Sequence, residues 1–359
     1  MHEIKRSILK LINKLFYKNS YYISALPPSQ VETTIKDFIN GGLIKEFERT
    51  LNNSIDITEL DTFYGKKLGN EKSIYNMPLD SKLSKMQSIE LAKQFFSSLG
   101  TDLSKNAIQV IENKSNKFRF IFEEYGNSLD NRGNPREAEV SNFSEVYCPR
   151  KGDLRDLYSI VHEVTHTFDL ENGDTEARKV FGEIAPQCME RMLDEYLLNL
   201  DDRDLLRYGL NKNTLIQDVK NRQISTFLSR KDNIRSFNNG TGNKELDLRY
   251  ILAQIYSFSF MKQDKKTKIN SLNSFIKNIS NNEFSSCSKS FSVDFKNKLR
   301  TQLLMSEIIN DVKNTHSQTT TLEKANLDKI NSINKAKEIT QNQDSTSSNA
   351  KKFDNENYK

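Results

Sequence analysis

Apolar residues recur at helical spacing along most of this chain. Between residues 30 and 51, and again between residues 88 and 99, they return every three or four positions, as on the buried face of an amphipathic helix. The same spacing begins again at Leu154 and predicts further helices beyond it. We therefore expect a mainly α-helical protein, whose later helices span residues 154–171, 174–197, 247–261 and 293–312.

Two shorter segments alternate between apolar and polar residues, which predicts strands. They cover residues 117–122 and 137–147, on either side of a polar loop at residues 127–135. Both segments precede the helix that we expect to begin with an N-cap at Asp153. The sequence therefore predicts a small β-sheet beside this helix, with residues 139–147 as an edge strand on which a substrate backbone could pair.

The composition divides the chain into three parts. Residues 1–29 carry apolar residues at helical spacing among basic ones, which predicts a first helix packed on the domain or, as an alternative, a helix that touches a membrane surface. Residues 30–316 hold the helices, the sheet and the chemistry described below. Residues 317–359 are rich in Thr, Ser, Asn, Gln and Lys with few large apolar residues, so we expect a polar, disordered tail.

Charge and composition exclude several classes of protein. The 53 basic and 48 acidic residues give a net charge of +5, and no Lys/Arg block with interleaved aromatic residues predicts a nucleic-acid site. No apolar run reaches the length of a membrane-spanning helix. The 13 Gly and 6 Pro are too few for a turn-rich β protein.

The cysteines bear on the compartment. Cys148, Cys188 and Cys287 are odd in number and form no CxxC motif, so neither a disulfide framework nor a cysteine zinc site is predicted. A reducing compartment, the cytoplasm, suits them best. Export by a non-standard signal stays open as an alternative.

The candidate chemistry is concentrated in the motif His162-Glu163-Val164-Thr165-His166. Residues i and i+4 lie one turn apart on the same face of a helix, so both imidazoles can bind one Zn²⁺. Zinc lowers the pKa of a water that it binds, and the neighbouring carboxylate of Glu163 can take a proton from that water as general base. The motif alone leaves open a chance occurrence on a charged helix, or a zinc site without catalysis.

A zinc peptidase of this kind needs a third protein ligand. Glu183 lies 17 residues after His166 (183 − 166) on the next predicted helix. We expect a turn at residues 172–173 to bring that helix back antiparallel, which places Glu183 beside the histidines. Other carboxylates of this stretch compete by residue type but lie nearer the turn or further along the helix: Glu176, Glu190, Asp194 and Glu195.

Two segments together resemble a known group of enzymes. Residues 160–166, IVHEVTH, followed by residues 183–190, EIAPQCME, are similar to the thimet oligopeptidase and oligoendopeptidase F family of zinc peptidases. Members carry an HExGH motif and then a helix that reads Glu-x-x-Ser-Gln-x-x-Glu. The resemblance implies a zincin-like catalytic domain that hydrolyses oligopeptides with one zinc ion per chain. It assigns the zinc to His162, His166 and Glu183, and the role of general base to Glu163.

A third segment, residues 248–257, is similar to the tyrosine-bearing helix of the same family. There a tyrosine hydroxyl stabilises the oxyanion of the tetrahedral intermediate, and Tyr250 falls at the matching position. Such a donor is typically worth on the order of 2.7–4 kcal/mol. Spacing alone would make Tyr250 and Tyr256 core aromatics of an amphipathic helix.

The chain departs from the family pattern at several positions. Thr165 and Pro186 stand where the family has Gly and Ser, and Asp169 stands where a third His is common. Asp247 replaces a second tyrosine, and the histidine that the family places upstream of the tyrosine is missing. The resemblance covers roughly residues 88–260, and the family chain is usually much longer.

Two further carboxylates are candidates for support of the histidines. A metal-bound imidazole usually donates its other N–H to a carboxylate or a carbonyl. Asp169 and Glu190 are placed by the sequence to accept it. The alternative at either position is an exposed, solvated carboxylate.

The sequence thus predicts a zinc-dependent metallopeptidase that acts on peptide substrates, most simply oligopeptides. Two alternatives stay open: a protease specific for one folded protein, exported to meet it, and a catalytically weak zinc-binding module. The missing histidine supports the module, and the intact Glu163 opposes it. The sequence does not define the oligomeric state.

Overall fold

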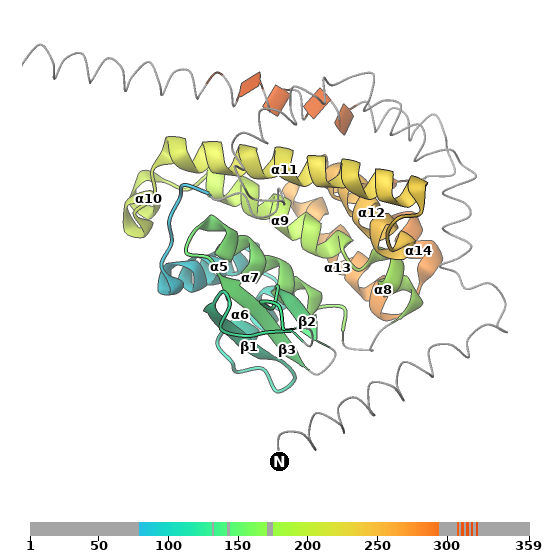
Figure 1. Cartoon of the computed structure of the whole chain (residues 1–359), viewed down its shortest axis with the longest axis horizontal. Coiled ribbons are helices and arrows are strands. Elements are labelled where there is room, and N and C mark those ends of the chain that lie inside the picture. Colours follow the sequence, from blue (N-terminus) through green and yellow to red (C-terminus); the bar gives the residue numbers. More distant parts are fainter. Residues whose placement is uncertain are drawn as a thin grey trace, which may run out of the picture.

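Figure 1 shows the computed structural model of the chain. Four sets of expectations lie outside the residues that it describes: the basic segment at 1–29, the helix at 30–51, the turn at 172–173, and almost all of the last helix and the tail beyond 293. The described residues are 79–293 without 131–132, 142–143 and 171–174, together with single positions between 307 and 321.

Within these residues the protein is mainly helical and holds one small sheet, as the sequence predicts (Figure 1). None of the described helices is both long and apolar enough to cross a membrane. The two helices expected at residues 88–99 and 247–261 are present and begin a few residues earlier. The helices, in chain order, are α5 (Lys85–Leu99), α6 (Asp102–Ile111), α7 (Leu154–His166), α8 (Glu176–Phe181), α9 (Ile184–Leu198), α10 (Asp202–Tyr208), α11 (Lys212–Asn239), α12 (Lys244–Met261), α13 (Lys265–Ser280) and α14 (Phe284–Ser288), followed by a 3-10 turn, η2 (Ser290–Ser292).

Three strands form one sheet that lies against α7. They are β1 (Arg119–Glu124), β2 (Glu139–Ser141) and β3 (Glu145–Arg150), in the spatial order β1-β3-β2. β1 runs parallel to β3, and β2 pairs with β3 antiparallel. The prediction of a small sheet beside the motif helix is confirmed.

The second predicted strand, residues 137–147, is wrong as a single element. Ser144 has a φ of +68° and lies between β2 and β3, which pair antiparallel. β3 lies in the middle of the sheet, with a neighbour on each side. The edge expected for a substrate backbone is therefore limited to β2, because only an outer strand has unpaired backbone groups.

α7 carries the HExxH motif and begins where the sequence predicts. The side chain of Asp153 accepts the backbone N–H of Arg155 at 3.0 Å, which satisfies a donor of the first turn that has no partner within the helix. The helix ends at His166 rather than near residue 172, so the second histidine of the motif is its last residue. α7 contacts both α9 and β3, and most of its residues are buried.

The long helix expected from residue 174 is broken into α8 and α9. The break falls at Gly182 and Glu183, and Glu183 is the N-cap of α9. A Cβ at Gly182 would lie 2.6 Å from the backbone oxygen of Arg178, so any side chain there would force the backbone apart. Pro186 lies in the first turn of α9, where its missing N–H is tolerated because first-turn N–H groups have no partner within the helix. Gly182 and Pro186 are thus signals of a break that the apolar spacing obscures.

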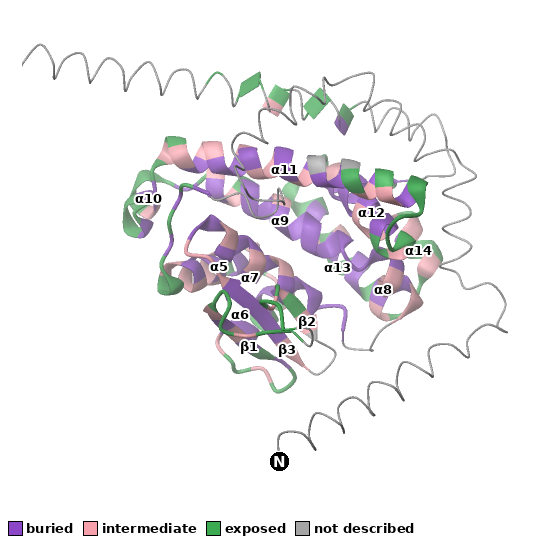
Figure 2. Ribbon diagram, viewed as in Figure 1, coloured by how far each residue is buried: buried purple, intermediate pink, exposed green. Residues whose placement is uncertain are grey.

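α9 forms the centre of the helical body. It lies between α7 and α12, and α11 runs along α9 and α12 (Figure 1). Most of α9 is buried, as are many residues of α7 and α12 (Figure 2). Each fully buried Leu, Ile or Phe side chain of such a core contributes about 1.5–3 kcal/mol relative to an exposed one. The packing therefore fixes the start of α9 against the last turns of α7.

Candidate metal centre

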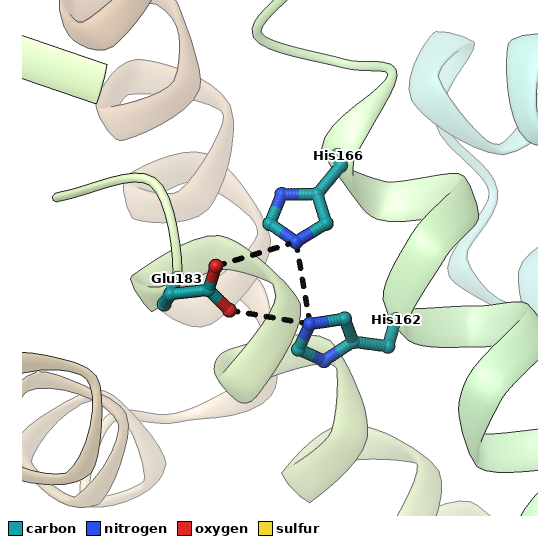
Figure 3. A group of neighbouring side chains, drawn as sticks. All are labelled: His162, His166 and Glu183. Carbon is teal, nitrogen blue, oxygen red and sulfur yellow. Dashed lines mark hydrogen bonds and ion pairs between the residues drawn. The ribbon is translucent and has the colours of Figure 1, made fainter. Parts of the chain in front are cut away.

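His162, His166 and Glu183 converge between α7 and the start of α9 (Figure 3). Nε2 of His162 lies 3.2 Å from Nε2 of His166 and 3.2 Å from Oε2 of Glu183. Nε2 of His166 lies 3.7 Å from Oε1 of Glu183. The three residues offer one ligand atom each within 4.8 Å of one another, a group that can hold a metal ion.

The spacing and chemistry of these atoms suit a divalent cation. Ligand atoms about 2.0–2.2 Å from a tetrahedral zinc ion lie roughly 3.3 Å from one another. Two of the observed separations are 3.2 Å. Oε2 of Glu183 is buried and meets no hydrogen-bond criterion with the described residues, although Nε2 of His162 lies 3.2 Å away as an ion-pair contact. A bound cation between these two atoms would satisfy the buried carboxylate oxygen more fully than this contact does.

Burial and mutual contacts set the ionisation of these groups. Burial lowers the pKa of His166 to about 3, so its ring is neutral at physiological pH. Burial raises the pKa of Glu183, but the imidazoles of His166 and His162 outweigh it and hold that pKa well below its usual range. Burial lowers the pKa of His162, but the carboxylates of Glu183 and Glu190 outweigh it and raise that pKa well above its usual range. A cation at this point would compete with the proton on His162, since zinc binds neutral imidazole.

Glu190 fixes the orientation of the His162 ring. Its Oε1 lies 2.9 Å from Nδ1 of His162. Because a carboxylate oxygen only accepts, Nδ1 donates, and in the neutral ring Nε2 then carries the lone pair that faces the other two ligand atoms. Oε2 of Glu190 accepts from Nε2 of Gln187 at 2.9 Å and pairs with Nη2 of Arg222 at 2.5 Å. Burial raises the pKa of Glu190, but the charge of Arg222 and the hydrogen bond from His162 outweigh it and lower the pKa to about 2.

Asp169, the other carboxylate expected to support an imidazole, has a different partner. It is 1% exposed, and its Oδ1 accepts from Nε of Arg178 at 3.1 Å. Nδ1 of His166 is buried and has no hydrogen-bond partner among the described residues. Of the two carboxylates, Glu190 therefore contacts an imidazole of the motif, through Nδ1 of His162, whereas Asp169 contacts Arg178 instead. Both carboxylates are buried, so the alternative of a solvated group is wrong for each.

The other carboxylates that compete for the third ligand position have partners elsewhere. Glu176 pairs with Lys179 at 2.7 Å, and Glu195 pairs with Lys268 at 2.8 Å. Asp194 accepts hydrogen bonds from side chains of α7 and α11. Glu190 contacts only one of the two histidines, His162, so Glu183 is the carboxylate among the described residues that lies against both histidines, as expected.

Glu163 lines a cavity of about 250 Å³, and His162, one of the three candidate ligands, lines the same cavity. Glu163 is 7% exposed. Burial raises its pKa to about 7; the charge of His162 opposes the rise, and nearby carboxylates add to it. A group that titrates near neutrality suits proton transfer. Residues of α7, α9, α11 and α12 line the cavity, among them His162, Glu163, Glu190, Arg222, Arg230 and Tyr250.

The two tyrosines of α12 have different surroundings. Tyr250 lines the cavity, and the guanidinium of Arg230 lies 4.6 Å from the centre of its ring. Tyr256 is fully buried and donates its hydroxyl to the backbone oxygen of Ser288 at 2.7 Å. Tyr256 is therefore a core aromatic, whereas Tyr250 shares the cavity with Glu163.

The contribution of α11 is not predicted from the sequence. Arg222 and Arg230 are spaced by about two helical turns, so they share one face of the helix, and both line the cavity. A usable signal is the buried series Leu215, Val219 and Phe237, which continues the spacing of the two arginines along the helix. This series identifies the inward side of an otherwise polar helix, but it does not indicate which other helix that side meets.

No protein-family model matches the chain, and no curated protein matches it. Among solved structures, the chain is similar to the crystal structure of a "putative peptidase from Chlamydophila abortus", with 15% sequence identity and a TM-score of 0.45. The match covers 83% of this chain and 57% of that chain, so this chain spans little more than half of that protein's length. A likeness this distant does not place the chain in a family.

Proposed function

We propose that this protein is a zinc-dependent metallopeptidase. The observation that supports the proposal best is the convergence of His162, His166 and Glu183, with His162 lining the same cavity as Glu163. Two imidazoles and one carboxylate are the protein ligands of a common class of catalytic zinc site, which keeps its fourth position for water or substrate. A zincin-like catalytic domain, with the motif helix next to a small sheet, belongs to the same proposal.

The residues divide the work of peptide-bond hydrolysis. Zinc held by the three ligands would polarise the scissile carbonyl and lower the pKa of water. Glu163 takes a proton from the attacking water and returns it to the leaving amine. Its burial and its pKa of about 7 suit both transfers. No side chain becomes covalently attached to the substrate.

Tyr250 has the proposed role of oxyanion donor. Its place on the same cavity as Glu163 supports this role, and the guanidinium of Arg230 covers one face of its ring. The proposed supporting carboxylates act in different ways. Glu190 holds His162 directly, whereas Asp169 anchors α8, the helix that leads to the third ligand, through Arg178.

Short peptides are the proposed substrates. The cavity lies between α7, α9, α11 and α12, and such surroundings favour a flexible chain over a folded domain. A protease that acts on one folded protein is the alternative within enzymes. Digestion of a peptide library separates the two, because broad cleavage of short peptides is expected only of an oligopeptidase.

Metal content and activity together test the proposal. Purified protein is expected to hold about one zinc ion per chain, measured by plasma mass spectrometry. Glu163→Gln should keep the metal and lose peptide hydrolysis, because an amide cannot accept the proton, and Glu183→Ala should lose the metal. Peptide hydrolysis by Glu163→Gln at the parent rate would refute the mechanism. A parent protein that binds zinc and cleaves nothing would leave only the zinc-binding module.

A further inference from the structure

A chain of polar contacts leads from α11 to the candidate metal centre. Nη2 of Arg222 lies 2.5 Å from Oε2 of Glu190, and Oε1 of the same carboxylate lies 2.9 Å from Nδ1 of His162. One buried carboxylate thus joins an arginine on one side to a candidate ligand on the other. Charge-assisted contacts of this length are among the stronger ones in proteins.

Arg222 is itself held from two further directions. Its guanidinium lies 3.6 Å from the centre of the Tyr158 ring, and its Nη1 lies 3.9 Å from Oδ1 of Asp194. Tyr158 donates its hydroxyl to that same oxygen of Asp194. A planar guanidinium that is stacked on a ring and placed between two carboxylates has little freedom. It therefore defines one position for the carboxylate of Glu190.

Because Glu190 is buried, its stability as a carboxylate depends on the positive charge of Arg222. Glu190 is 8% exposed, and the Arg222 side chain is 16% exposed. The other hydrogen bonds that Glu190 accepts from the described residues come from the neutral amide of Gln187 and from the His162 ring, which is neutral when it binds a metal ion, so Arg222 is the permanent counter-charge. A buried carboxylate that loses its counter-charge is strongly destabilised. Without Arg222, Glu190 would gain by turning toward solvent, away from His162.

We infer that Arg222 is a positioning residue of the metal centre. Through Glu190 it keeps His162 in the ring orientation and the tautomer in which Nε2 faces His166 and Glu183. The inference rests on the proposed zinc site, but it does not require that the protein cleave peptides. It makes the docking of α11 on α9 a determinant of metal affinity, although none of the three residues that can hold the ion belongs to α11.

Zinc affinity of the full-length protein tests the inference. Arg222→Met removes the charge and the planar group but keeps much of the volume. We expect its zinc Kd, measured by competition with a chelating dye, to rise about 10–100-fold, as is typical when the partner of a metal-bound histidine is lost. Arg222→Lys keeps the charge without the planar guanidinium, so its zinc Kd should lie between those of the parent and Arg222→Met. Arg191→Met is the matched control, because Arg191 follows Glu190 in the chain but donates to Ser257 of α12 at 3.0 Å, and its Kd should equal that of the parent.

Two further measurements separate positioning from general destabilisation. In the zinc-loaded parent, the Nδ1–H proton of His162 should give a downfield NMR signal that is protected from exchange with water. That signal should be lost in Arg222→Met and kept in Arg191→Met. In the double variant Arg222→Met with Glu190→Gln, the amide oxygen can accept the same N–H and needs no counter-charge. The double variant should therefore recover part of the zinc affinity. This recovery can be measured even if Arg222→Met alone folds poorly.

The outcomes are distinguishable from one another. A parent-like Kd in Arg222→Met with the Nδ1–H signal retained would overturn the inference, and so would an equal loss of affinity in Arg191→Met. Failure of the double variant to recover any affinity would also count against it. A parent protein that shows these differences in zinc binding but cleaves no peptide would refute the proposed function and leave the inference standing. A parent protein that binds no zinc would overturn both.

Discussion

Gly182→Ala sets two physical effects against each other next to a candidate metal ligand. Gly182 has a φ of −61° and a ψ of −24°, which any L-residue adopts. On chain entropy alone, alanine there would therefore stabilise the protein by about 0.4–1 kcal/mol. The added Cβ, however, would lie 2.6 Å from the backbone oxygen of Arg178 and 3.3 Å from its Cγ. The first pair must separate by 0.4 Å (3.0 − 2.6) to reach the shortest contact that real Cβ atoms show.

The steric effect is expected to outweigh the entropic one. Overpacking of this kind costs about 1–3 kcal/mol. The oxygen of Arg178 also accepts the N–H of Gly182 at 2.8 Å, so it cannot swing aside as a side chain would. We expect Gly182→Ala to lower the free energy of unfolding by about 1–2 kcal/mol. Because Glu183 is the next residue, the same shift moves its carboxylate and should weaken zinc binding.

Urea unfolding of the zinc-free protein measures the stability, and chelator competition measures the zinc Kd. Gly209→Ala is the matched control, since Gly209 has a φ of +65° at the C-cap of α10 and a Cβ there would meet nothing within 4 Å. In Gly209→Ala, the strain of a left-handed backbone should lower the free energy of unfolding by about 1 kcal/mol and leave the zinc Kd unchanged. A Gly182→Ala protein more stable than the parent would refute the steric reasoning. A parent-like Kd would show that the position of Glu183 tolerates the shift.

Two further predictions concern the metal and the tyrosines. Chelation of the metal is expected to lower the melting temperature of the parent, since a ligand at 1,000 times its Kd stabilises a protein by about 4.1 kcal/mol. The melting temperature of Glu183→Ala should not change on chelation. An equal decrease in that variant would indicate another metal site. Tyr250→Phe is expected to reduce kcat about 10²–10³-fold, because its hydroxyl is proposed to donate to the oxyanion. Tyr256→Phe should keep kcat and lose about 0.5–1.5 kcal/mol of stability with the hydrogen bond to Ser288. An equal loss of kcat in both tyrosine variants would contradict these assignments.

Features that depend on residues close together in the chain were predictable from the sequence. The start of α7 at the Asp153 cap and the small sheet beside it follow from capping and from apolar alternation, which act within one short segment. The errors arise where a single residue interrupts such a pattern. Ser144 in the left-handed region separates β2 from β3, and Gly182 allows the close approach that ends α8. Apolar spacing continues across both positions, so periodicity alone does not reveal them.

By itself, the sequence determined that His162, Glu163 and His166 share one helix and that both histidines lie on one face of it, because helical spacing fixes both facts. Only the tertiary structure decided which distant groups meet that face. Glu183 was the third ligand expected from its place on the next helix, but its contact with the histidines depends on the break before α9 and on the packing of α9 against α7. The contact of Glu190 with His162, and the approach of Arg222 from α11, depend on how three helices pack together. Residues so far apart in the chain are brought together by burial of the core, and no spacing within one helix encodes their distance.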